Sequence, residues 1–367
     1  MKILVLGAGR MGYGAVYDLV RQPDVDRVTV ADAVAERAHR VASAAGNGKA
    51  TPVQLDVTDE RATIDLMRDH QAVLSCVVYK LNEGLARSAI AAKTNFCDLG
   101  GNNDVVDAEL SLDEDAKRAG INIIPDCGLA PGMVALLVAH AAERFEKLDS
   151  IRIRVGGLPQ NPKPPLDYQL VFSVEGLINE YIEPARVVRE GRITTVESMT
   201  EVEEIEFPPP FGRLEAFQTS GGTSTLPETF LGRIRELDYK TIRYRGHCEK
   251  FKTMIDLGLC KGEARKMFSE LLVRNLPHDE PDVVLVRVEV AGGGRVLRYD
   301  IIDRYDPATG LSAMMRTTAF PAAIVALIMG RGQTTSKGAL PQERCVPPDL
   351  FMRELAARKI EVKEKWL

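Results

Sequence analysis

Three glycines near the N-terminus have the spacing of a turn that holds phosphate groups. Gly7, Gly9 and Gly12 follow the apolar run KILVL in the order G-x-G-x-x-G. After a strand, the first glycine permits a tight turn, the second lets the backbone approach a pyrophosphate, and the third lets helix and strand pack closely. A helix that begins here offers its N-terminal N–H groups to the phosphates. We therefore expect Arg10 and Met11, together with the glycines, to bind a dinucleotide.

A carboxylate stands where such a site distinguishes two forms of the dinucleotide. The run RVTVAD ends at Asp32, about 20 residues after the last glycine of the turn. An acid there accepts hydrogen bonds from both ribose hydroxyls of NAD and repels the 2′-phosphate of NADP. Arg10 and Arg37 could neutralise that phosphate instead. The sequence therefore predicts NAD as the cofactor, with NADP as the alternative.

Other apolar runs of the first third also end in residues that could line a ligand site. In open α/β sheets, ligands bind beyond the carboxyl ends of the strands. Asp56 and Val57 are expected beside the adenine, and Cys76 and Val77 along the nicotinamide half of the cofactor. The expected cofactor residues are completed by Asp98 and Gly128. A plain structural role is the alternative for each of these residues.

The elements that must position these residues alternate through the first third of the chain. The apolar runs are KILVL, RVTVAD, TPVQLDV, AVLSCVV, NFCDLG and INIIPDCG, and helix-like stretches such as DERATIDLMRDH separate them. Runs rich in Val, Ile and Leu suit parallel strands that are buried on both faces. We expect an α/β protein with a doubly wound Rossmann sheet over 1–128, completed by C-terminal helices over 313–367.

From Asp149 the pattern changes to β-forming residues in alternation. Expected strands are SIRIRVGG, YQLVFSVE, GRITTVES, EEIEF, YKTIRYRG, DVVLVRVEV and RVLRYDIID, with a hairpin at the glycines 292–294. The pattern predicts an α+β domain with a mixed sheet over 129–312, which would bind the substrate and support oligomerisation.

Composition narrows the class of protein. The chain has 367 residues and a net charge of -5, which gives no reason to expect nucleic acid or an anionic membrane as a partner. The apolar stretch AFPAAIVALIMG is shorter than the roughly 20 residues that span a bilayer. Six cysteines form no CxxC pair and do not cluster with the five histidines, so we expect no metal. Buried thiols and no signal peptide suit a cytoplasmic protein.

Five motifs, GAGRMG, CVVYKLN, FCDLGGN, PDCGLAPGM and TIRYRGHCEKF, together resemble the saccharopine dehydrogenase family of the reductase type. Within it, the chain looks most like the lysine 6-dehydrogenases. The resemblance implies a homo-oligomer and an amino-acid substrate oxidised at a C–N bond. Ala130 stands where the saccharopine enzymes typically carry Asp, and Glu175 where they tend to carry Arg. An acid suits an ammonium group, which favours free lysine over saccharopine.

The resemblance thus implies NAD-dependent oxidative deamination of L-lysine at the ε-carbon, to allysine (2-aminoadipate 6-semialdehyde) and ammonia. Hydride leaves readily only from the neutral amine, whose reference pKa is about 10.4. The site therefore needs a base, or the enzyme should prefer alkaline pH. The alternatives are saccharopine or carboxynorspermidine dehydrogenase of the same family, and a non-catalytic NAD-binding protein.

Candidate residues for this reaction come from both halves of the chain. Glu175, His247 and Lys80 are candidates for the base, and Tyr79 could orient the substrate. Arg243 is expected to hold the substrate α-carboxylate, because its guanidinium binds carboxylates bidentately. In the stretch TSGGTSTLPET, the residues expected to hydrogen-bond the substrate are Ser220, Gly222 and Thr223. Each could instead be structural: a solvated acid, a locally bonded histidine, a surface lysine or a mere turn.

Overall fold

The computed structural model describes residues 1–367, which divide into two units. Unit 1 comprises Met1–His140 and Met315–Lys359, and unit 2 comprises Ala141–Met314 and Ile360–Leu367. The first boundary therefore lies later than the expected residue 128, because an apolar helix (α7) follows the last strand of the N-terminal half. The last eight residues form part of unit 2 and not of unit 1.

Unit 1 is built on a parallel sheet of seven strands in the order β15-β6-β5-β4-β1-β2-β3. Its strands are β1 (Lys2–Leu6), β2 (Arg27–Asp32), β3 (Ala50–Gln54), β4 (Ala72–Ser75), β5 (Asn95–Asp98), β6 (Asn122–Ile124) and β15 (Gly338–Ala339). The central strand β1 is buried from Ile3 to Leu6, as expected of a sheet covered on both faces. The predicted doubly wound sheet is confirmed, with β15 as an addition that the sequence did not reveal.

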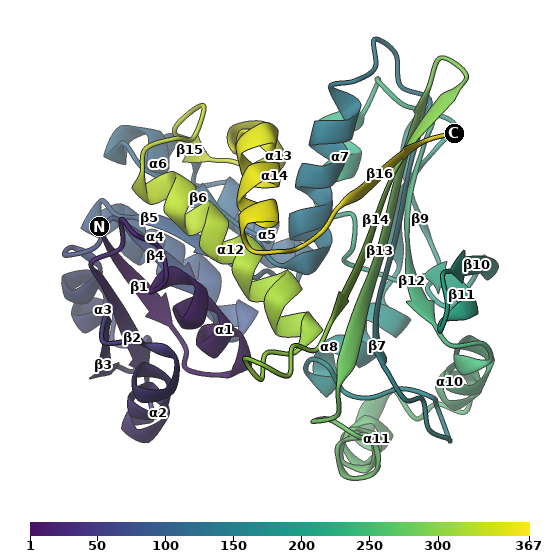
Figure 1. Ribbon diagram of the computed structural model, residues 1–367, viewed down its shortest axis with the longest axis horizontal. Helices are drawn as coiled ribbons and strands as arrows, with labels where there is room; N and C mark the ends of the chain where they lie inside the picture. Colours follow the sequence, from purple (N-terminus) through teal and green to yellow (C-terminus); the bar gives the residue numbers. More distant parts are fainter. The chain divides into compact units, whose positions relative to one another are not determined.

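Helices cover both faces of this sheet (Figure 1). They are α1 (Arg10–Leu19), α2 (Ala35–Ala45), α3 (Glu60–Met67), α4 (Asn82–Ala92), α5 (Asn103–Leu110), α6 (Asp113–Ala119), α7 (Val134–Ala142), α12 (Ala313–Gly330), α13 (Gln342–Cys345) and α14 (Pro348–Ala357), with short turns η1 (Tyr79–Leu81) and η2 (Leu129–Met133). Helix α12 has the length and apolar composition of a membrane span, and 78% of it is buried inside the protein, as in the core helix of a folded domain.

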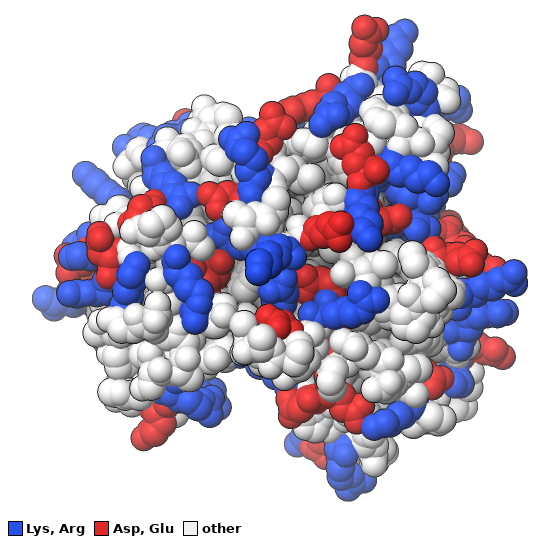
Figure 2. Space-filling model, in the orientation of Figure 1, with Lys and Arg blue, Asp and Glu red and all other residues white.

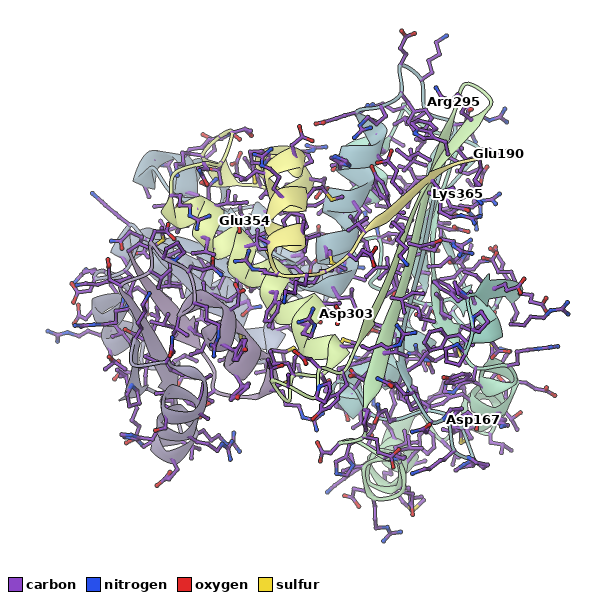
Figure 3. The ribbon with its side chains drawn as sticks, viewed as in Figure 1. Asp167, Glu190, Arg295, Asp303, Glu354 and Lys365 are labelled. Carbon is purple, nitrogen blue, oxygen red and sulfur yellow. The ribbon has the colours of Figure 1, made fainter.

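The C-terminal helices are held to α1 by packing and by charge. The rings of Tyr17 and Phe320 stack with their centroids 6.5 Å apart. Arg358, just after α14, donates from Nη2 to Asp18 Oδ2 at 2.8 Å, and both side chains are 5% exposed. Glu354, labelled in Figure 3, accepts from Arg331 Nη1 at 2.7 Å. These contacts make α12 and α14 part of unit 1.

Unit 2 contains a nine-stranded mixed sheet with the main order β10-β11-β12-β7-β13-β14-β16, to which β8 and β9 are added beside β12. The strands are β7 (Ser150–Pro159), β8 (Ala185–Arg189), β9 (Arg192–Val196), β10 (Glu203–Phe207), β11 (Gly212–Gln218), β12 (Glu236–Arg243), β13 (Asp282–Gly292), β14 (Arg295–Arg304) and β16 (Lys363–Trp366). Strands β7 and β12 run parallel, and the other pairs are antiparallel. The expected hairpin at 292–294 and the mixed sheet are confirmed.

One expected strand of unit 2 is a loop and a helix instead. The stretch YQLVFSVE runs without regular structure to Ser173, and helix α8 spans Val174–Ile182. Ser173 Oγ accepts the N–H of Gly176 and so caps the helix, while Leu177 and Tyr181 pack their shared face into the core. Helix α8 packs with α10 (His247–Asp256) and α11 (Gly262–Asn275). The remaining helix of unit 2 is α9 (Leu226–Phe230). The apolar residues of 174–181 recur with the period of a helix, and this pattern decided the structure rather than the short strand-like alternation over 168–175.

The surface carries charges of both signs. On the face that Figure 2 shows, Lys and Arg are interspersed with Asp and Glu, and no block of one sign dominates.

Candidate active site

The glycine turn of unit 1 fits the backbone of a dinucleotide. Gly7 has a φ of +95°, and a Cβ on Gly12 would lie 2.0 Å from the carbonyl oxygen of Gly7, so no larger residue fits either position. Gly9 is exposed, and a Cβ there would meet no atom within 4 Å, which leaves room for a pyrophosphate. Helix α1 begins at Arg10 with no side-chain cap and no acid in its first turn. Its positive end is therefore not neutralised by the protein.

Asp32 is held at the edge of this turn. Its Oδ2 accepts the N–H of Ala8 at 2.8 Å, and its Oδ1 accepts the N–H of Val34 at 2.9 Å. These two bonds fix the half-buried carboxylate at the carboxyl end of β2. Arg10 and Arg37, the residues that could favour NADP, are both exposed.

Asp56 and Val57 follow β3 at the same edge of the sheet. Asp56 Oδ1 accepts the N–H of Thr58 at 2.9 Å and its hydroxyl at 2.7 Å. These hydrogen bonds lower the pKa of Asp56, so it stays ionised. Val57 is half-buried against the core of unit 1. Both residues shape the loop before α3, and Asp56 is exposed.

The end of β4 carries four further predicted residues. Cys76 donates its N–H to the carbonyl of Leu6 at 2.7 Å, and burial raises the pKa of its thiol, so it is no nucleophile. Val77 packs against the core. Tyr79 is half-buried in η1 and Lys80 is exposed, and neither side chain makes a hydrogen bond or an ion pair in the structure. Their part in the site therefore stays a prediction.

Asp98 and Gly128 both hydrogen-bond to backbone N–H groups of neighbouring loops. Asp98 is fully buried, and its Oδ1 accepts the N–H groups of Gly100 at 2.6 Å and of Asp126 at 3.3 Å. The carbonyl of Gly128 accepts the N–H of Met133 at 2.7 Å. We therefore do not favour the expected direct contact of the Asp98 carboxylate with the cofactor, because this side chain holds the N–H groups of Gly100 and Asp126 instead.

Arg243 is the buried cation of unit 2. It ends β12, is 2% exposed, and lies with its guanidinium carbon 4.8 Å from the ring centroid of Tyr168. Its Nε donates to Tyr181 Oη at 2.8 Å, and its Nη1 donates to the carbonyl of Ile242 at 2.9 Å. Nη2 makes no hydrogen bond within the protein. The guanidinium is thus locked in place with one edge left for an anionic group.

His247 is placed to orient this group and not to act as the base. Its Nδ1 lies 3.0 Å from the carbonyl of Leu166, which can only accept, so Nδ1 carries the proton. Nε2 therefore accepts from Tyr181 Oη at 3.1 Å, while Tyr181 Oη accepts from Arg243. Burial and the charge of Arg243 lower the pKa of His247 to about 3. The ring of His247, a candidate for the base, is therefore neutral, and both of its nitrogens are hydrogen-bonded within the protein.

Glu175 does not join this group either. It lies in the first turn of α8 and not at a strand end, and its side chain is 63% exposed. Its Oε2 pairs with Arg265 Nη2 at 2.7 Å, and its Oε1 accepts from Ser269 at 3.4 Å. The argument that an acid at 175 selects an ammonium substrate is therefore corrected: this carboxylate is neutralised on the outer side of the helix.

Glu180, which the sequence analysis missed, takes the expected place of an acid near Arg243. It is half-buried on α8, and its carboxylate makes no hydrogen bond or ion pair in the structure. Loss of hydration raises its pKa to about 7, although the charge of Arg243 acts in the opposite direction. Had 174–182 been predicted as a helix, Glu180 could have been recognised, because it adjoins Tyr181 on the core side of that helix.

The stretch 219–225 packs on α8 and β12. Ser220 donates its N–H to the carbonyl of Glu180 at 3.0 Å, and Thr223 Oγ1 donates to the carbonyl of Arg186 at 3.0 Å. A Cβ on Gly222 would lie 2.3 Å from the ring of Tyr239, so only glycine fits there. The expected hydrogen bonds from these hydroxyls to substrate are not favoured, because Ser220 Oγ donates to the carbonyl of Asn179 at 3.4 Å and Thr223 Oγ1 to that of Arg186.

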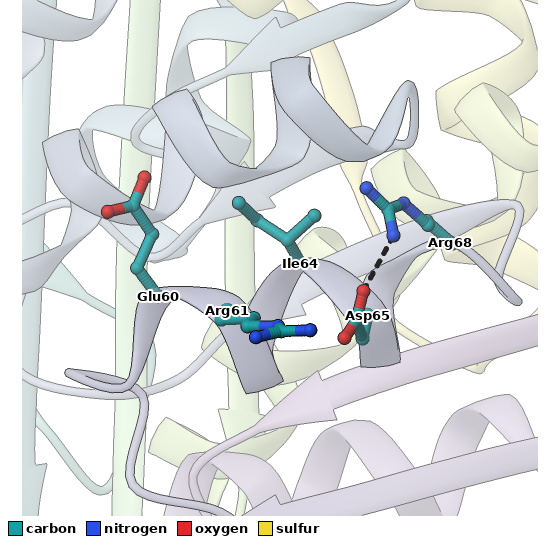
Figure 4. Close-up of a pocket in the computed structure, with 5 residues that line it drawn as sticks. All are labelled: Glu60, Arg61, Ile64, Asp65 and Arg68. Atoms are coloured by element: carbon teal, nitrogen blue, oxygen red, sulfur yellow. Dashed lines mark hydrogen bonds and ion pairs between the residues drawn. The ribbon is translucent and has the colours of Figure 1, made fainter.

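A separate shallow hollow lies on α3 (Figure 4). It is lined by Glu60, Arg61, Ile64, Asp65 and Arg68. Arg68 pairs with Asp65 at 2.6 Å, and the hollow contains none of the predicted site residues. No group of three or more His, Cys, Asp or Glu that could hold a metal is present.

Comparison with known proteins matches both halves of the chain. Residues 3–124 match the family model of the saccharopine dehydrogenase NADP binding domain, and residues 128–360 match that of the saccharopine dehydrogenase C-terminal domain. A relative named saccharopine dehydrogenase [NADP(+), L-glutamate-forming], from Saccharomyces cerevisiae, is 27% identical over 281 residues, which are 74% of this chain and 61% of the relative. The mitochondrial alpha-aminoadipic semialdehyde synthase of Bos taurus is 23% identical over 274 residues, 72% of this chain and 29% of the relative.

Solved structures show the same fold. The apo saccharopine dehydrogenase (L-Glu forming) of Saccharomyces cerevisiae has a TM-score of 0.83 at 21% identity, covering 100% of this chain and 99% of that one. The homospermidine synthase of Legionella pneumophila, in complex with NAD, has a TM-score of 0.74 at 12% identity, covering 100% and 91%. The chain spans about three fifths of the length of the first curated relatives. By both of its domains, the chain belongs to the saccharopine dehydrogenase family.

Proposed function

We propose that this protein is an oxidoreductase that converts L-lysine, with NAD and water, to allysine, ammonia and NADH. The observation that carries the proposal is the pair formed by Arg243 and Glu180. A locked guanidinium with one open edge acts by its charge on a carboxylate that has no hydrogen-bond or ion-pair partner in the structure. Such a pair matches the α-carboxylate and α-ammonium of a free amino acid. NAD accepts the hydride, and Asp32 favours it over NADP.

Each residue has a defined task in this proposal. Arg243 Nη2 donates to the α-carboxylate, while Tyr181 and His247 keep the guanidinium fixed. Glu180, once ionised, accepts from the α-ammonium. Tyr79 and Lys80 remain the candidates to orient the reacting amine and to take its proton at the carboxyl end of the unit 1 sheet.

A second candidate is saccharopine dehydrogenase activity with NADP, which the names of the relatives and of the matched NADP binding domain favour. Saccharopine carries more carboxylates than lysine, and each needs a positive partner. Arg243 is the one cation that acts on Glu180, so this cluster offers a single guanidinium. One guanidinium and one carboxylate suit one zwitterionic head group, which supports lysine.

Lysine alone is expected to reduce NAD, and faster as the pH rises from neutral, because hydride leaves only from the neutral ε-amine with its pKa of about 10.4. The measurement is NADH formation with lysine, ornithine and saccharopine, with either cofactor. Turnover only in the reductive direction, with an aldehyde, an amino acid and NADPH, would assign saccharopine or carboxynorspermidine dehydrogenase instead. Cofactor binding without turnover of any amine would leave a non-catalytic NAD-binding protein.

Glu180→Gln is expected to raise KM for lysine by about 10- to 100-fold with little change in kcat, because one charge-assisted hydrogen bond is lost. The pKa of Glu180 is raised to about 7, so wild-type kcat/KM should fall as the pH drops through that value and the carboxylate becomes protonated. In Glu180→Gln this acidic limb should disappear. Glu175→Gln, on the exposed side of the same helix, is the matched control. An effect of Glu175→Gln alone would restore Glu175 as the functional acid.

A further inference from the structure

Two carboxyl groups lie together beneath the loop that follows β5. Asp98 ends β5 and Glu109 lies on α5, and both side chains have 0% exposure. Asp98 Oδ1 accepts two backbone N–H groups, those of Gly100 and Asp126. Asp98 Oδ2 and both carboxyl oxygens of Glu109 are buried and have no hydrogen-bond partner. The two carboxyl groups act on each other's pKa, and a proton on one of them would supply the donor that these oxygens lack.

Glu109 is the member that carries the proton. Two ionised carboxylates in contact inside a protein repel each other strongly, so the pair holds one charge. The two N–H groups stabilise that charge on Asp98. Around Glu109, Asp126 after β6 and Glu83 on α4 add further negative charge, and with burial they raise its pKa well above the usual range. A protonated Glu109 would thus have a hydroxyl to donate to the carboxylate of Asp98.

The loop above this pair has no room to shift. Gly100 has a φ of +74°, and a Cβ there would lie 1.6 Å from Asp126 Oδ1. Gly101 has a φ of +134°, and a Cβ there would lie 3.1 Å from the side chain of Tyr79. At the far end of the loop, Asn102 caps α5 by accepting the N–H of Asp104 at 3.0 Å. Helix α5 then carries Glu109 back to Asp98, so the loop is closed at both ends.

We propose that Glu109 is a positioning residue, which as a neutral acid donates to Asp98 and thereby holds the loop 99–102 against Tyr79. The role goes beyond the proposed lysine activity, because it fixes the carboxyl end of the unit 1 sheet for whichever amine the protein oxidises.

The test compares Glu109→Gln, which keeps an N–H donor, with Glu109→Leu, which removes it, in the full chain. At pH 9, where Glu180 with its pKa of about 7 is ionised, the infrared carbonyl band of a protonated Glu109 should be present in the wild type and lost in both variants. Glu114→Gln, which changes an acid whose side chain is 75% exposed, should leave that band unchanged. Hydrogen exchange at the Gly100 and Asp126 amides should quicken about tenfold in Glu109→Leu, the effect of one buried hydrogen bond, and stay near wild type in Glu109→Gln.

These measurements need no substrate, so they are independent of the lysine proposal. With any amine found to be oxidised, kcat should fall in Glu109→Leu and be restored in Glu109→Gln. The proposal is overturned if Glu109→Gln leaves the infrared band in place, or if Glu109→Leu exchanges its loop amides like the wild type. If Glu109→Leu does not fold, the infrared comparison of the wild type with Glu109→Gln decides.

Discussion

Arg243→Ala is expected to lower kcat/KM for lysine by roughly a thousandfold, because breaking a desolvated charge pair costs about 3–5 kcal/mol. The open Nη2 edge is the only part of this guanidinium that the protein does not use. The α-carboxylate is held equally in the ground state and the transition state, so the loss should appear mainly as a higher KM. The measurement is steady-state kinetics that separate kcat from KM. Circular dichroism verifies that the variant is folded.

Two further variants sharpen this prediction. Arg243→Lys keeps the charge but loses the planar fork, and an intermediate loss is expected. Arg245→Ala is the matched control, because this side chain lies two residues further on and is 65% exposed. If Arg243→Ala folds and binds lysine with an unchanged KM, the head group of the substrate is held elsewhere.

Asp32→Ser is expected to reverse the cofactor preference, with NADH binding weakened and NADPH binding strengthened, each by about 10- to 100-fold. The variant loses the charge-assisted bonds to the ribose hydroxyls of NAD and the repulsion of the 2′-phosphate of NADP, each worth about 1.5–3 kcal/mol. Fluorescence titration with NADH and NADPH measures this directly, without an amine substrate.

Glu36→Gln serves as the control, since Glu36 is an exposed acid in the first turn of α2, close to Asp32 in the sequence. Tighter binding of NADPH than of NADH by the wild type would contradict the prediction. It would assign the phosphate to Arg10 and Arg37, in agreement with the name of the matched NADP binding domain.

The dinucleotide half of the site could be predicted because its parts are contiguous. Gly7, Gly9 and Gly12 lie within one strand–turn–helix segment, and Asp32 ends the neighbouring strand. The spacing of these residues in the sequence largely fixes their positions in space, because one turn and the neighbouring strand are enough to place them. Arg243 was predicted as a carboxylate ligand because a guanidinium binds carboxylates bidentately, and the structure buries it at the end of β12.

The sequence by itself determined the α/β class, the parallel sheet of the first half and the glycine turn, since each follows from local periodicity. Only the tertiary structure decided which acids matter. Glu175 and Glu180 share one helix, yet Glu175 pairs with Arg265 at the surface, while Glu180 is half-buried and its pKa is raised to about 7 by loss of hydration. Likewise, Glu109 on α5 is buried with Asp98 at the end of β5, and each acts on the pKa of the other. A carboxylate's pKa and partners depend on residues distant in the chain, and packing alone brings those together.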